Sequence, residues 1–241
     1  MSDADLAALL ADTAGELLMT LRDSGTVEGK ALGNVGDATA NAYLIQALAA
    51  LRPADGLLSE ERVDDLSRLE KSRVWIVDPL DGTREYAEGR DDWAVHVALS
   101  IDGHAAVGAV ALPAQGLVLR SDQSPPMVTR PERPRILVSR TRPPPGGAIL
   151  QERLGAELVP MGSAGAKAMA VILGQGDIYF HTGGQHQWDN AAPVAVALGA
   201  GMVATRVDGS PCTYNARETL LPDLLICAPE WEAPVRAALR S

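Results

Sequence analysis

Cysteine is nearly absent from the sequence. Cys212 and Cys227 are the only two, they form no CxxC pair, and their spacing fits no metal-ligand motif. A disulfide framework and a zinc site are therefore not indicated, and we expect a reducing compartment. The sequence also lacks any apolar run near the ~20 residues that cross a bilayer, and its first residues are acidic where a signal peptide would be basic. We expect a cytoplasmic protein without a membrane partner.

Positive charge and aromatic side chains are scarce as well. Lys and Arg number 21 against 31 Asp and Glu, which gives a formal net charge of -10, and aromatic residues make up 4% of the chain. Nucleic-acid binding depends on clustered Lys and Arg, so we expect no nucleic-acid partner. An acidic protein can still bind a small phosphorylated molecule, because a bound divalent cation reverses the local field. With 46% apolar residues in 241, the chain is long enough for one large domain or two packed halves with mainly aliphatic cores.

Apolar periodicity predicts helices followed by a sheet in the first part of the chain. The expected helices cover residues 3–22 and 37–51, separated by a glycine-containing break over 25–36. The expected strands cover 56–61 and 73–78, followed by a hairpin of 91–101 and 105–114 that turns at Asp102-Gly103. The segments 121–134 and 142–147 are rich in Pro, Ser, Arg and Gly, which predicts loops and a boundary between two halves.

Strand and helix patterns alternate in the second part of the chain. Strands are expected over 135–139, 177–180 and 201–205, and helices over 147–154, 163–174, 190–200 and 229–240. Such alternation is typical of an α/β arrangement. No repeat of about 20 to 50 residues is evident, which argues against solenoids and propellers. We predict an N-terminal α+β half, residues 1–125, and a C-terminal α/β half, residues 126–241.

The segment WIVDPLDGT places two carboxylates where a strand is expected to end. Asp78 follows the strand, and Pro79 is expected to turn the chain before Asp81. Crowded carboxylates repel one another unless cations lie between them, and hard oxygen ligands suit Mg²⁺ better than zinc or copper. Gly82 and Thr83 follow, and their backbone N–H groups can approach an anion. Taken alone, this short motif is explained equally well by an ordinary acidic turn.

Two further acidic positions are candidates for the same cluster. Glu60 ends the apolar run GLLSE, although a solvated pair of surface Glu residues is the commoner explanation for such a position alone. Asp189 lies in QHQWDNAA directly before a helical pattern. It can cap that helix, bind a metal, or do both.

Candidate substrate contacts follow in the second half. Ser163 and Lys167 are four residues apart at the start of an expected helix and therefore share a face, although a cap and a solvated Lys explain them equally well. His181 and His186 flank the sequence TGGQ and can reach a leaving group, with His181 the stronger candidate. Lone histidines are more often structural, and His96, inside a strand pattern, is expected to be so.

Taken together, SEE, DPLDGT, GSAGAK and WDNAA, in this order and at these intervals, resemble the motifs of the lithium-sensitive inositol monophosphatase superfamily. The resemblance covers nearly the whole chain. Within the superfamily, DGTREY, the Lys of GSAGAK, GGQHQWD and YNARETLLPD resemble the CysQ-type phosphatases most closely. The resemblance implies a layered αβαβα sandwich of the inositol monophosphatase and fructose-1,6-bisphosphatase type, a Mg²⁺-dependent phosphatase activity and a homodimer.

The resemblance also implies a role for each motif residue. Metal ligands for two or three Mg²⁺ ions would be Glu60, Asp78, the carbonyl of Leu80, Asp81 and Asp189. Water activated by Thr83 and Asp37, with help from Glu60, would attack phosphorus in line without a phosphoenzyme. Phosphate and substrate contacts would come from Gly82, Thr83, Ser163, Lys167 and His181. The superfamily usually has Thr three residues before the acid that Asp37 matches, whereas this chain has Asn34, which leaves the role of Asp37 open.

The implied reaction is hydrolysis of the 3'-phosphate of 3'-phosphoadenosine 5'-phosphate to AMP, in sulfate assimilation. The alternative is a phosphatase for inositol 1-phosphate, fructose 1,6-bisphosphate or both, because only the leaving-group pocket would differ. A non-catalytic homologue that binds metal or nucleotide is a second alternative, against which the complete set of acids argues. Removing the carboxylate of Asp78 or Asp81 is expected to abolish turnover with little effect on folding, because we interpret both acids as unpaired.

Overall fold

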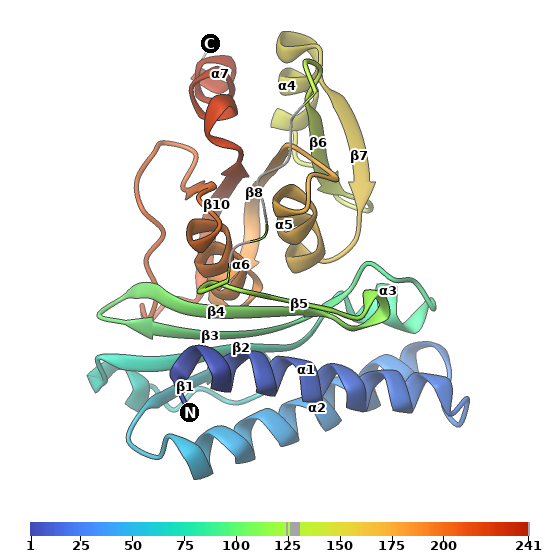
Figure 1. Ribbon diagram of the computed structural model, residues 1–241, viewed down its shortest axis with the longest axis vertical. Coiled ribbons are helices and arrows are strands. Elements are labelled where there is room, and N and C mark those ends of the chain that lie inside the picture. The colour runs from blue at the N-terminus through green and yellow to red at the C-terminus, as the bar shows by residue number, and fades with distance from the viewer. Residues whose placement is uncertain (124, 126–130, 241) are drawn as a thin grey trace.

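Two sheets alternate with three layers of helices in the computed structural model, which describes residues 1–123, 125 and 131–240 (Figure 1). Two helices cover one outer face, two lie between the sheets, and two cover the other outer face. In that order they are α1 (Asp3–Asp23) and α2 (Gly29–Leu51), α5 (Ala164–Ile172) and α6 (Gln187–Gly199), and α4 (Gly146–Leu154) and α7 (Pro229–Arg240). The expected αβαβα sandwich is confirmed. No described helix is both long and apolar enough to span a bilayer.

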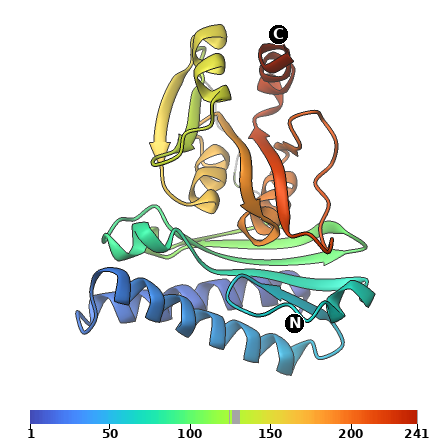
Figure 2. The ribbon, with the colours of Figure 1, turned by 180° about the vertical axis from the view of Figure 1, so that it is seen from behind.

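The two sheets differ in strand direction (Figures 1 and 2). The first has the order β1 (Gly56–Ser59), β2 (Arg73–Asp81), β3 (Ala94–Ile101), β4 (His104–Leu112) and β5 (Leu117–Arg120). Only β1 and β2 are parallel within it, and β3 with β4 is the hairpin that the sequence predicts. The second has the order β7 (Glu157–Met161), β6 (Arg135–Ser139), β8 (Ile178–His186), β10 (Leu220–Cys227) and β9 (Val203–Thr205). Here β10 runs antiparallel to both of its neighbours.

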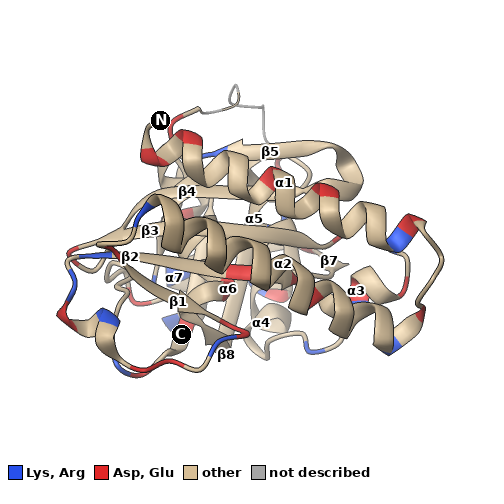
Figure 3. Ribbon diagram, turned by 90° about the horizontal axis from the view of Figure 1, so that it is seen from below, with Lys and Arg blue, Asp and Glu red and all other residues tan. Residues whose placement is uncertain are grey.

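Apolar side chains of the described residues form a core between each pair of layers. Leu44 and Val97 belong to the core between α1, α2 and the first sheet. Met169 belongs to the core around α5 and α6, and Leu150 and Phe180 to the outer core beneath α4 and α7. The outer layer is acidic on α1, where Arg22 is the only basic residue, so this helix offers no basic stripe to nucleic acid (Figure 3).

The expected break over 25–36 is wrong over most of its length, because α2 already begins at Gly29. Glycine usually weakens a helix, but here it permits close packing. A Cβ on Gly33 would lie 2.8 Å from Cγ2 of Thr83, and one on Gly36 would lie 3.0 Å from Cε1 of Tyr86. The glycines therefore let α2 approach the segment that follows β2.

The strand before the acidic motif is also longer than expected. It continues through Pro79 to Asp81, and its pairing with β3 shifts register between Asp78 and Asp81. Proline is tolerated at such an irregularity because its missing N–H is not needed there. Three strands, β5, β7 and β10, were not predicted from the sequence. Part of the loop expected over 121–134 and the boundary between 125 and 126 involve residues outside the described ones, so the two-half division stays a prediction.

Candidate active site

Three acids from two elements meet where the pairing of β2 with β3 is interrupted. Asp78 lies opposite His96 and Asp81 opposite Ala94, so β2 contains one extra residue between them. Bulges of this kind re-aim side chains next to active sites. Asp189 comes from the first turn of α6. Carboxylate oxygens of Asp78, Asp81 and Asp189 all lie within 4.8 Å of one another, an arrangement that can hold a metal ion.

Asp78 is poorly stabilised as a carboxylate. It is 1% exposed and accepts a hydrogen bond from the Leu80 backbone N–H at 3.1 Å. Burial raises the pKa of Asp78 well above its usual range, and the charges of Glu60 and Asp81 raise it further. Ionisation of such a group requires a cation beside it.

Asp81 is in the opposite situation. Its Oδ2 accepts hydrogen bonds from the Ser163 hydroxyl and, at 2.6 Å, from the Gly165 backbone N–H, and lies 3.2 Å from His96 Nε2. Burial alone would raise the pKa of Asp81, but the charges of His96 and Lys167 and the Ser163 hydroxyl hold it well below its usual range. The expectation that both motif acids are unpaired is therefore wrong for Asp81.

Asp189 belongs to α6, and Glu60, directly after β1, is near enough for their charges to interact. Asp189 accepts the His186 backbone N–H and so caps α6 while it faces the other acids. Burial, followed by the charge of Asp81, raises the pKa of Asp189 to about 6. Glu60 is exposed as a whole residue, yet burial of its carboxyl and the charge of Asp189 raise its pKa to about 7. Among the described residues, Glu60 lies outside the tight group of three acids.

Thr83 connects the motif to α2. Its Oγ1 lies 3.0 Å from Asp37 Oδ2 and 3.1 Å from the carbonyl oxygen of Leu80, and can donate to either. Asp37 is 8% exposed, and its Oδ1 has no hydrogen-bond partner among the described residues. Burial raises the pKa of Asp37 to about 7, although the hydrogen bond from Thr83 lowers it. The departure from the family pattern at Asn34 therefore leaves the Thr83–Asp37 contact in place.

Ser163 and Lys167 lie at the start of α5 and line the same cavity as Asp81. The Ser163 hydroxyl accepts the Ala166 backbone N–H at 2.9 Å in addition to donating to Asp81. Lys167 is 5% exposed, and its Nζ donates to the carbonyl oxygens of Gly162 and Ser163. Burial lowers the pKa of Lys167 to about 8. Contact of either side chain with substrate stays a prediction, and the Ser163 hydroxyl already serves Asp81 and the helix end.

The cavity has a volume of about 290 Å³ and is also lined by His181, by residues 139–142 and by Arg84. His181 Nε2 is buried without a partner among the described residues, and burial lowers the pKa of this imidazole. Residues 139–142 and Arg84 were not among the predicted site residues. A signal for the former is present in the sequence, because RILVSRTR places two arginines directly after a strand, and ligands often bind at the carboxyl ends of strands in α/β sheets.

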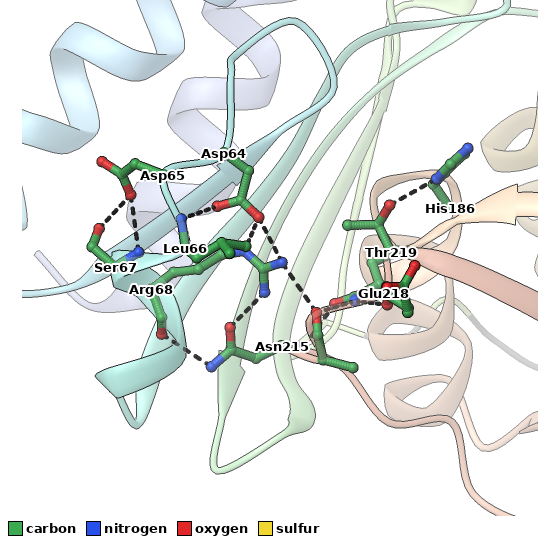
Figure 4. Close-up of polar contacts among 11 residues, drawn as sticks. Asp64, Asp65, Leu66, Ser67, Arg68, His186, Asn215, Glu218 and Thr219 are labelled. Atoms are coloured by element: carbon green, nitrogen blue, oxygen red, sulfur yellow. Dashed lines mark hydrogen bonds and ion pairs between the residues drawn. The ribbon is translucent and has the colours of Figure 1, made fainter.

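A chain of hydrogen bonds joins the segment after β1 to the region around Asn215 (Figure 4). Arg68 is 1% exposed and donates to Asp64 Oδ2 at 3.0 and 2.8 Å and to Asn215 Oδ1 at 2.8 Å. The Asn215 backbone N–H donates in turn to Gln187 Oε1 at 2.7 Å. Gln187 is the first residue of α6, two positions before Asp189. We call these contacts the Arg68 brace, and they connect the segment after β1 with the turn that carries Asp189.

Comparisons with known proteins match nearly the whole chain. The model of the inositol monophosphatase family matches residues 3–240. The 3'-phosphoadenosine 5'-phosphate phosphatase of Mycobacterium leprae (strain TN) is 50% identical over 242 residues, covering 94% of this chain and 89% of that protein. The 3'(2'),5'-bisphosphate nucleotidase CysQ of Escherichia coli (strain K12) is 28% identical over 236 residues, covering 90% of this chain and 96% of that protein.

Solved structures share the layered fold. CysQ from Bacteroides thetaiotaomicron superimposes with a TM-score of 0.79 at 24% identity, covering 92% of this chain and 96% of that one. Inositol monophosphatase II from Staphylococcus aureus MSSA476 superimposes with a TM-score of 0.81 at 19% identity, covering 98% and 96%. At these identities the likeness shows the fold alone.

Proposed function

The chain belongs to the inositol monophosphatase family, and from this premise we propose that it removes the 3'-phosphate from 3'-phosphoadenosine 5'-phosphate, giving AMP and phosphate. The observation that carries the proposal is the convergence of Asp78, Asp81 and Asp189 within 4.8 Å. The substrate follows from the 50% identical relative, which is named for this nucleotide. We further propose that the enzyme is a cytoplasmic homodimer that clears this by-product of sulfate assimilation.

The acids fit Mg²⁺ on chemical grounds. Asp78 is a buried carboxyl whose ionisation requires a cation, and Asp37 Oδ1 is a buried acceptor without a partner among the described residues. Carboxylate and carbonyl oxygens are the ligands that Mg²⁺ prefers. The proposed ligands for two or three ions are Glu60, Asp78, the Leu80 carbonyl, Asp81 and Asp189. When bound, Mg²⁺ neutralises charge on the phosphoryl oxygens and lowers the pKa of water.

Thr83 and Asp37 handle the proton of the attacking water in the proposed reaction. Thr83 Oγ1 accepts a hydrogen bond from that water and donates its own proton toward Asp37 Oδ2, 3.0 Å away. A base with a pKa near the working pH is the most effective, and the pKa of Asp37 is about 7. Glu60, which is also a proposed metal ligand, assists in activating the water.

Phosphate and nucleoside are held by groups around the cavity. Gly82 has a φ of 91°, and a Cβ there would lie 3.2 Å from the Cβ of Ser163, so only glycine allows the backbone N–H groups of Gly82 and Thr83 to face the phosphate closely. Lys167 supplies positive charge beside the phosphate. Neutral His181 accepts a hydrogen bond from the nucleoside at its unpartnered Nε2.

The test is phosphate release with Mg²⁺ from 3'-phosphoadenosine 5'-phosphate, inositol 1-phosphate and fructose 1,6-bisphosphate, measured side by side. We expect the highest kcat/KM for the nucleotide, loss of activity in Asp189→Asn, and no change in Asp12→Asn, an exposed acid on α1 outside the site. A higher kcat/KM for a sugar phosphate would support the proposed active site but contradict the proposed substrate. Inactivity on all three would favour the non-catalytic alternative.

A further inference from the structure

Three arginines line the cavity that contains Asp81, although the chain as a whole carries a net charge of -10. They are Arg84, Arg140 and Arg142. Guanidinium groups bind phosphate oxygens through paired donors, so each of them is a candidate for a second anion besides the one at the carboxylates. The partners that each arginine already has decide which of them is free to bind one.

Arg140 is already neutralised. Its Nη2 lies 2.9 Å from Glu85 Oε1 and 2.8 Å from Glu88 Oε2. These two pairs fasten residues 139–142 to α3 (Thr83–Ala87) and the turn after it. Arg84 lies in α3 directly after Thr83, whose backbone N–H is proposed to contact the reacting phosphate, and it also lines the cavity.

Arg142 is exposed, and among the described residues no carboxylate forms an ion pair with it. Its backbone is nevertheless fixed, because the Arg142 N–H donates to Ser139 Oγ at 3.2 Å. Its charge also acts inside the cavity. Burial lowers the pKa of His181, and the charges of Lys167 and Arg142 lower it further against the hydrogen bond to Gly183. Arg142 therefore has a fixed backbone and a positive charge that no described carboxylate neutralises. This charge acts on His181, the proposed nucleoside contact.

We propose that Arg142 binds the non-reacting phosphate of a nucleoside bisphosphate, the 5'-phosphate when the 3'-phosphate lies at the carboxylates. The inference rests on the proposed function and names the residue that selects a bisphosphate over a monophosphate. The Thr141 hydroxyl lines the same cavity and adds a donor to this subsite. Because the 5'-phosphate does not react, Arg142 stabilises the bound substrate and the transition state alike, which lowers KM without raising kcat.

The experiment compares 3'-phosphoadenosine 5'-phosphate with adenosine 3'-monophosphate, which differs only in lacking the 5'-phosphate. Arg142→Ala is expected to raise KM for the bisphosphate about tenfold or more, the usual loss for a charged hydrogen bond, with kcat little changed. For the monophosphate, the kcat/KM of Arg142→Ala is expected to equal that of the wild type. Arg142→Lys is expected to recover part of the affinity for the bisphosphate. Arg217→Ala removes the same charge from an exposed residue outside the cavity. This control variant is expected to leave kcat/KM unchanged for both substrates.

If Arg142→Ala lowers kcat/KM equally for both substrates, or for neither, the proposed subsite is overturned. A bisphosphate-selective loss in Arg84→Ala instead would move the second phosphate to α3 and overturn the assignment to Arg142. Calorimetric binding of 3'-phosphoadenosine 5'-phosphate to the same variants separates this inference from the proposed function. If the wild type binds the nucleotide through Arg142 but does not hydrolyse it, the subsite stands and the proposed function fails.

Discussion

Two acids only three positions apart in the sequence have opposite electrostatic environments. Asp81 has three polar partners, and its pKa lies well below the usual range, whereas Asp78 is buried among like charges and its pKa is raised. The motif DPLDGT predicts both acids but not this difference. Ser163 and Gly165 lie at the start of α5 and His96 lies in β3, and only the packing of those elements brings these partners to Asp81 in β2.

The difference predicts opposite effects of two matching substitutions on stability in EDTA at pH 7. Asp81→Asn replaces an ionised acceptor by a neutral amide and is expected to lower the free energy of unfolding by about 1–3 kcal/mol. Asp78→Asn removes a carboxyl that burial and neighbouring charges disfavour, so it is expected to increase that free energy. Both variants should lose turnover with Mg²⁺. Urea unfolding checks the prediction, and equal destabilisation by both substitutions would contradict it.

Sequence patterns located secondary structure best where periodicity was uninterrupted. The helices α1, α5 and α7 and the β3–β4 hairpin follow their apolar patterns closely. Proline concealed other elements, because it normally signals a break inside a strand. Pro160 lies in β7, an edge strand where a missing N–H is tolerated, and Pro222 lies at the register irregularity of β10. Only the complete sheet shows that these prolines occupy permitted positions.

The Arg68 brace spans elements that no local pattern connects, and it predicts coupling between folding and metal binding. Arg68→Ala leaves Asp64 without its buried partner and is expected to lower the free energy of unfolding by about 3 kcal/mol. It also removes the side-chain hydrogen bonds from Arg68 to Asn215 and to the Ala216 carbonyl, so that, among the described residues, only the bonds from Asn215 to backbone carbonyls still link the segment after β1 with the first turn of α6. We therefore expect the increase in Tm caused by Mg²⁺ to shrink, with its midpoint at a higher Mg²⁺ concentration.

Arg236→Ala is the matched control for this prediction. Arg236 is also buried and also pairs with an acid four residues earlier, Glu232, but it lies in α7 against the outer face. It should lose stability without losing the response to Mg²⁺. A thermal shift titration of both variants distinguishes the effects, and an unaltered Mg²⁺ midpoint in Arg68→Ala would show that the brace serves stability alone.

At the scale of the whole molecule, the site lies where separate cores meet. β2 places Trp75 and Val77 in the core under α1 and α2, and Val74 and Ile76 in the core between the sheets, which also contains α6. The packing of both layers therefore fixes β2, and with it Asp78, beside the helix that carries Asp189. The resemblance to a known family predicted this layered arrangement and the motif acids, whereas composition and periodicity alone gave two halves without their relative placement. Neither predicted residues 139–142 as cavity lining, because that contact depends on how the second sheet sits above the first.

Holding several acids together makes the stability of the whole protein depend on pH and metal. The pKa is raised to about 7 in Asp37 and Glu60, to about 6 in Asp189, and well above its usual range in Asp78. An acid whose pKa is higher in the folded than in the unfolded state binds more protons when folded. Its stabilising contribution is complete below the unfolded pKa of about 4 and is lost as pH rises through the folded value.

Bound Mg²⁺ reverses this dependence, because it requires ionised carboxylates and so competes with their protons. Saturation at a hundred times Kd adds about 2.7 kcal/mol of stability, and Kd itself falls as the acids ionise. We expect the increase in Tm caused by a fixed Mg²⁺ concentration to be small at pH 5, to grow between pH 6 and 7, and to level off by pH 8. Differential scanning calorimetry measures this increase as the difference in Tm between a sample with Mg²⁺ and a sample with NaCl at the same ionic strength. An increase of the same size at pH 5 and pH 8 would mean that ionisation of these acids does not limit binding, which contradicts a cluster held together by its cations.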